Sequence, residues 1–195
     1  TEHTCKSLKG SCYLLAAEVN AFYTEKDEKL RTKCRRWQDQ AANLLYKGKI
    51  EEDETFLWFN LYAVHHERAK TLARFSLFHV NDNELLEHLK GKFVHVEKRF
   101  LEDAHEALAI AKKHLDQDSI HQTATMDYTF TEARIFLIGK EFEESAKVAK
   151  RALKIAHAIH SQQGIEQVRK VYAMLYELEP KNPYVRNLAV ELGIY

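Results

Sequence analysis

Hydrophobic and polar positions along this chain recur with the three- and four-residue spacing of amphipathic helices. No alternation of Val, Ile and Thr with polar residues lasts beyond a few positions, so the pattern does not predict strands. Helix-forming Ala, Leu, Glu and Lys recur throughout, and both prolines, Pro180 and Pro183, lie near the C-terminus. The chain is therefore predicted to be all-α.

Cap and turn signals divide this pattern into about eight helices. Acidic or small polar residues begin most of them, and Gly48 and Gly139 end two. The first helix is predicted over 4–23, and the second runs from the TEKDEK turn (24–29) to 46. The others are predicted over 53–79, 84–115, 123–138, 140–160, 165–178 and 184–192, with Gly91 as a candidate interruption of 84–115. Because the links are short, neighbouring helices are expected to pair into four antiparallel hairpins.

The clearest pattern lies in GKEFEESAKVAKRALKI, residues 139–155. An aromatic residue, three small residues and a leucine stand at offsets 0, 3, 7, 10 and 11, which places them on one helical face: Phe142, Ser145, Ala149, Ala152 and Leu153. The small residues would let a neighbouring helix approach closely, and the larger ones would fill the remaining volume. The same offsets, without the last, recur 41 residues earlier in Leu101, Ala104, Leu108 and Ala111.

The order of these residues resembles the tetratricopeptide repeat family. Ala133 and Phe136 precede the linking Gly139, the aromatic and small residues of the second helix follow, and Pro180 resembles the proline that often ends such a repeat. The tryptophan, leucine and first glycine usual in the first helix are absent around 129–133. The resemblance covers residues 123–180, and the alternative is an ordinary helical bundle with small residues in its core.

The resemblance implies a single α-solenoid domain over residues 1–195, in which the first helix of each hairpin lines a groove. It places Asp127, Phe130 and Arg134 on the groove side of 123–138, where Arg134 would bind a carboxylate and Phe130 would supply apolar area. Tyr62 and His65 would line the same surface if 53–79 is the first helix of its hairpin.

An aromatic segment, FLWFNLY, covers residues 56–62. Phe56, Trp58, Phe59 and Tyr62 are too many to share one narrow helical stripe. Phe56 and Phe59, with Leu57 or Tyr62, are predicted to face a core, whereas Trp58 would point elsewhere.

Composition and charge narrow the possible partners and compartment. Of the 195 residues, 45% are hydrophobic and 30% charged, which is typical of a soluble globular chain. The 29 basic residues equal the 29 acidic ones, which argues against nucleic acid as a direct partner.

There is no apolar run of membrane-spanning length and no secretory signal. An odd number of cysteines, three, suggests a reducing compartment, so we expect a cytoplasmic location. The start at Thr instead of Met is what we expect of a domain excised from a longer protein.

Catalytic and metal signals are weak. Glu102 and His105 form an E-x-x-H pair, but a second pair, Asp118 and His121, falls in a predicted turn. Three arginine–histidine pairs match the R-x(4–6)-H spacing of the helical ribonucleases called HEPN domains: Arg74/His79, Arg99/His105 and Arg151/His157. The residues after these arginines are Phe, Phe and Ala, where that family favours a polar residue. No nucleotide-binding or serine-hydrolase motif occurs, so we predict no catalytic residue, metal site or cofactor.

The sequence therefore predicts a non-catalytic module that binds a protein or peptide, as a scaffold or sensor domain of a signalling or regulatory protein. Two alternatives remain at this point. One is a small-molecule-sensing domain of a transcription regulator, and the other is a HEPN-like ribonuclease.

Overall fold

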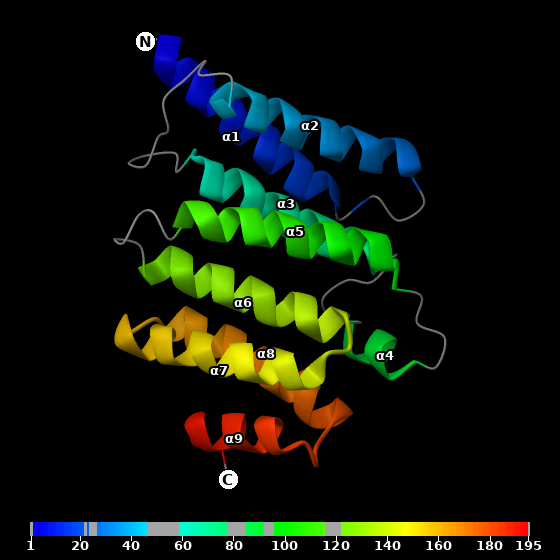
Figure 1. Ribbon diagram of the computed structural model, residues 1–195, viewed down its shortest axis with the longest axis vertical. Coiled ribbons are helices and arrows are strands. Elements are labelled where there is room, and N and C mark those ends of the chain that lie inside the picture. The colour runs from blue at the N-terminus through cyan, green and yellow to red at the C-terminus, as the bar shows by residue number, and fades with distance from the viewer. Residues whose placement is uncertain are drawn as a thin grey trace. The chain divides into compact units, whose positions relative to one another are not determined.

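The computed structural model describes residues 2–21, 23, 27–46, 59–77, 85–91, 96–115 and 122–194. These residues form helices and no β-strand, which confirms the all-α prediction (Figure 1). The helices are α1 (Glu2–Ala21), α2 (Glu28–Tyr46), α3 (Leu61–Phe75), α4 (Leu85–Lys90), α5 (Lys98–Leu115), α6 (Gln122–Ile138), α7 (Phe142–Ala158), α8 (Gln162–Leu178) and α9 (Pro183–Glu191).

Side-chain caps determine where several helices begin. Asn60 Oδ1 accepts a hydrogen bond from the backbone N–H of Ala63 at 2.8 Å and caps α3. Ser161 Oγ accepts from the N–H of Gly164 at 3.1 Å and caps α8. In α9 the cap is Asn182, and Pro183 follows it at the first helical position, where no backbone N–H is needed.

Two helix ends differ from a simple glycine stop. Gly139 follows α6 as predicted, but the left-handed conformation falls on the next residue, Lys140, with φ 61°. His160, with φ 54°, takes the same conformation after α7. The helix predicted over 84–115 is divided after Lys90, so nine helices form in the described ranges instead of the expected eight.

Contacts within the chain divide it into two compact units. Unit 1 comprises Thr1–His79 and Glu97–Gln117, and it contains α1, α2, α3 and α5. Unit 2 comprises Val80–Val96 and Asp118–Tyr195, and it contains α4 and α6 to α9. The assignment of 1–195 to a single domain stays a prediction.

In unit 1, α1 packs on α2, α3 packs on α5, and α1 and α2 both contact α3. The Phe59 side chain is fully buried in a core that also includes Leu14, Leu45 and Val64. Tyr62 is buried as well, so the prediction that Phe59 and Tyr62 face a core is confirmed. Phe56, Leu57 and Trp58 lie outside the described residues.

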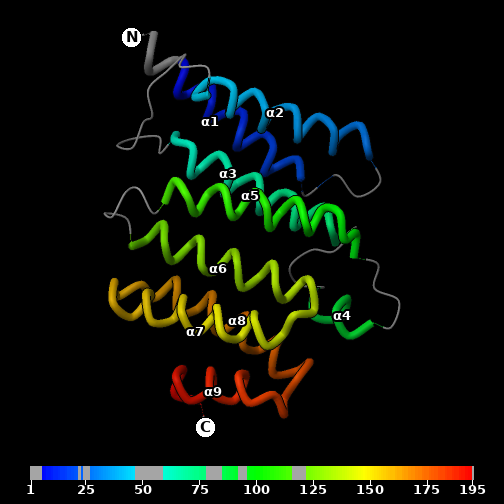
Figure 2. Tube along the Cα trace, viewed as in Figure 1, coloured from blue at the N-terminus to red at the C-terminus, as the bar shows by residue number. Residues whose placement is uncertain are grey.

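In unit 2, α6 packs on α7, α7 on α8, and α8 on α9, with a further contact between α6 and α8 (Figure 2). The small residues of α7 lie in these contacts: Ser145, Ala149 and Ala152 are fully buried. Ser145 Oγ donates a hydrogen bond to the carbonyl oxygen of Ala133 at 2.8 Å, which ties α7 to α6. The predicted core face of α7 is therefore confirmed for these residues and for Leu153, whereas Phe142 at the start of the helix is half-buried.

None of the helices in the described part of the chain combines the length and the apolar character needed to cross a membrane.

Candidate functional site

The three residues predicted on 123–138 occupy one stripe of α6. Asp127, Phe130 and Arg134 follow the i, i+3, i+7 spacing of a single helical face, and all three are half-buried. Met126, one turn before Phe130, reaches toward α8, where its Sδ would lie 2.3 Å from a Cβ added to Gly164. The stripe therefore runs along the edge of the α6–α8 contact, and its role in partner binding stays a prediction.

Tyr62 and His65 lie on α3 in unit 1, where both side chains are buried. Their exposed fractions are 8% and 6%. The ring of Tyr62 stacks on the ring of His66 with centroids 5.3 Å apart. Both side chains therefore belong to the interior of unit 1.

His65 has an electrostatic environment that disfavours its charged form. Its Nε2 lies 2.7 Å from the hydroxyl of Tyr46, and its ring stacks on that of His114 with centroids 6.1 Å apart. Burial, followed by the charges of Arg68 and His114, lowers the pKa of His65 from 6.5 to about 4. The imidazole is therefore neutral at physiological pH and contributes to packing and hydrogen bonding.

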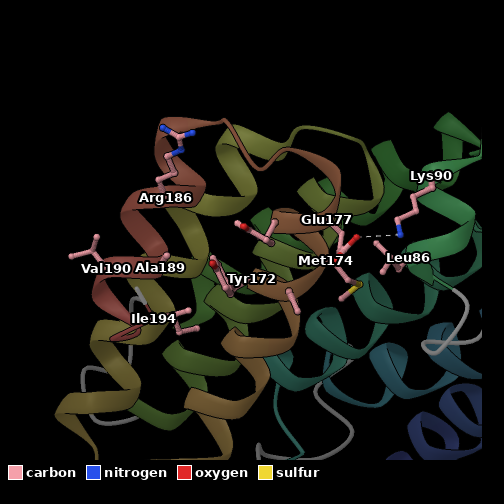
Figure 3. Close-up of a pocket in the computed structure, with 11 residues that line it drawn as sticks. Leu86, Lys90, Tyr172, Met174, Glu177, Arg186, Ala189, Val190 and Ile194 are labelled. Carbon is pink, nitrogen blue, oxygen red and sulfur yellow. Dashed lines mark ion pairs between the residues drawn. The ribbon is translucent and has the colours of Figure 1, made fainter.

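Unit 2 has a concave surface, here called the α8 groove, among its described residues. Residues of α8 lie between those of α9 and α4 (Figure 3). The groove has a volume of about 840 Å³, and eight of its eleven lining residues are apolar or aromatic. Three of them expose large side chains: Tyr176 (50%), Val190 (59%) and Ile194 (39%). Exposed apolar residues that gather in one groove are typical of a binding surface.

The charges of the α8 groove are unevenly paired. Lys90 Nζ lies 3.4 Å from Glu177 Oε2 across the α4–α8 contact (Figure 3). It also lies 3.5 Å from Glu87 Oε1. Arg186 on α9 donates from Nε to the carbonyl oxygen of Pro180 at 3.3 Å. Its two Nη atoms have no partner within the described ranges, so Arg186 is the one lining charge that no acidic side chain compensates there.

These lining residues are not among those predicted from the sequence. One local signal points to some of them: Arg186, Val190 and Ile194 are spaced four residues apart across and just beyond α9, which predicts a stripe on that short helix. The contribution of α4 has no such signal, because α4 ends at Lys90 whereas α8 begins only at Gln162, and the two helices approach each other only in the folded unit.

Some of the residues considered for chemistry have structural partners, and others lie outside the described ranges. Arg151 Nη2 bonds Glu132 Oε2 at 2.8 Å and so links α7 to α6. His79, Asp118 and His121 lie outside the described residues. Within the ranges described, no group of three or more His, Cys, Asp and Glu side chains is arranged to hold a metal ion.

Comparison with known proteins finds no family model, curated protein or solved structure that matches this chain.

Proposed function

We propose that this chain is a non-catalytic protein-binding module, built from stacked helical hairpins similar to tetratricopeptide repeats, that recognises a peptide segment of a partner protein on unit 2. It would serve as a scaffold or sensor domain within a signalling or regulatory protein. The observation that carries the proposal is the α8 groove, an open and mainly apolar surface with charged residues at its edges. The pairwise packing of α6 to α9 through small residues supports the hairpin arrangement.

Affinity capture from source-cell extract tests this proposal, using immobilised wild type and two variants. Ala173 is exposed in the groove, so A173R introduces bulk and charge there without disturbing the core. F130A/R134A removes the stripe on α6. Melting temperatures close to that of the wild type confirm that each variant is folded.

We expect at least one protein to bind the wild type and to be lost with A173R. A protein lost only with F130A/R134A would move the binding surface to the α6 stripe. If wild type and both variants capture the same proteins, or none, the proposed binding module is wrong.

A small-molecule ligand is the second candidate, because the groove volume lies within the roughly 300–1,000 Å³ common for such ligands. A ligand of this kind would raise the melting temperature of the wild type and leave that of A173R unchanged. A thermal-shift screen of metabolites on both proteins separates this candidate from peptide binding.

A further inference from the structure

We propose that the α8 groove receives an amphipathic helix of the partner protein, with a carboxylate side chain on the flank that faces Arg186. This inference rests on the proposed function and specifies the chemistry of its partner. Three features of the groove support it: its backbone, its small residues and its charges.

The backbone around the groove favours a helix over an extended peptide. Its lining residues on α8 and α9 lie inside those helices, apart from Ile194, so their N–H groups are already bonded within the helix or to its cap. Most of their C=O groups are bonded as well, and those of Tyr176 and Glu177, in the last turn of α8, are the ones without a donor from the helix. An extended peptide would bring its own unpaired backbone groups to a surface that offers them few partners. A bound helix satisfies its own backbone and presents only side chains, as in helix-in-groove recognition.

The side chains of the groove suit an apolar helical stripe. Ala173 on α8 and Ala189 on α9 are small and let a third helix approach closely. Met174 and Val190 flank them and provide apolar contact, and methionine adapts readily to different side chains. Burial of the exposed Val190 and Ile194 would supply part of the binding free energy.

The charges orient the bound helix. Lys90 and Glu177 lie close enough to compensate each other on the side of α4. Arg186, on the side of α9, keeps both Nη atoms available within the described residues, and a guanidinium pairs well with a carboxylate through two parallel hydrogen bonds. A Glu or Asp on the helix flank beside α9 therefore completes the pairing, whereas a Lys there would be repelled.

The test uses a displayed library of amphipathic helices with a constant leucine stripe and flanks that vary among Glu, Lys and Gln. The library is selected separately on the wild type, on R186E, on A173R and on K112E. Lys112 is exposed on α5 in unit 1 and does not line the groove, so K112E makes the same change of charge at a residue outside the proposed site. An unrestricted peptide library is selected on the wild type in parallel.

We expect the wild type and K112E to enrich Glu on one flank, R186E to enrich Lys at that position, and A173R to enrich nothing. A selected Glu peptide should bind R186E about tenfold more weakly than the wild type, and its Lys twin should show the reverse preference.

The same flanking residues in the wild-type and R186E selections would overturn the pairing with Arg186. Enrichment from the unrestricted library alone would overturn the helical partner and leave the binding module standing. If neither library yields a peptide that binds the wild type, the inference and the proposed function both fail.

Discussion

The side chain of His65 makes the stability of unit 1 depend on pH. Its pKa is about 4 in the folded protein and near 6.5 in an unfolded chain, so the unfolded state binds more protons between these values. The stabilisation is complete above pH 6.5 and is lost as the pH falls toward 4, by up to about 3 kcal/mol.

Denaturant unfolding of the wild type and of H65Q at pH 7 and at pH 4.5 measures this contribution. Glutamine keeps a hydrogen-bonding group at this position and does not titrate. We expect the wild type to lose more stability than H65Q over this range. An equal loss in both proteins would show that His65 is not held neutral by its surroundings.

Position 10 on α1 requires glycine, because the ring of Phe59 lies where a side chain at this position would be. A Cβ added to Gly10 would lie 2.1 Å from Cζ of Phe59, whose ring is fully buried and cannot move aside easily. Alanine is normally favoured over glycine inside a helix by about 1 kcal/mol. We nevertheless expect G10A to lower the free energy of unfolding by about 1–3 kcal/mol because of overpacking.

The double variant G10A/F59L provides the control, since the smaller leucine leaves room for the added methyl group. Thermal or denaturant unfolding should show that G10A costs less in the F59L background than in the wild type. A gain in stability from G10A alone would contradict the packing described for α1 and Phe59.

At the scale of elements, α1 shows how neighbouring positions of one helix differ in their contribution to stability. Leu14 is 8% exposed and belongs to the core of unit 1, whereas Leu15 is 60% exposed. We expect L14A to reduce the free energy of unfolding by about 2–4 kcal/mol and L15A to change it by less than about 0.5 kcal/mol. Similar effects in both variants would mean that α1 packs with a different face.

Helix bounds were predictable from the sequence wherever their signals are local. The ranges expected for α6, α7 and α9 agree with the structure to within about two residues, because caps and turns such as Asn182 and Gly139 act on adjacent backbone groups. The structure starts α8 at Gln162, three residues before the expected 165, because Gly164 belongs to the first turn of the helix and not to the preceding loop.

Features that depend on tertiary contacts were not predictable in this way. Gly91 could be noted as an interruption, but nothing local indicates that α4 belongs with α8 and α5 with α3. The left-handed turn after α6 falls on Lys140 instead of the glycine, which helix-end rules do not anticipate. Likewise, the spacing of Tyr62 and His65 was compatible with a groove, and only the packing of unit 1 shows that both are buried.

In the molecule as a whole, the two units have different proposed roles. The residues that carry the proposed binding surface, from Leu86 on α4 to Ile194 after α9, all belong to unit 2. Unit 1 contains the buried histidine and aromatic contacts that make its stability sensitive to pH.

The chain contains only two methionines, which makes one measurement especially direct. Met174 lines the α8 groove, and Met126 reaches from α6 toward Gly164, one turn before Phe130 in the α6 stripe. Labelling the methionine methyl groups with ¹³C gives one NMR signal for each, and M174L assigns them. The account predicts that a captured partner or selected helix shifts or broadens the Met174 signal and leaves that of Met126 in place. A change at Met126 alone, or at neither methionine under saturating ligand, would contradict binding in the α8 groove.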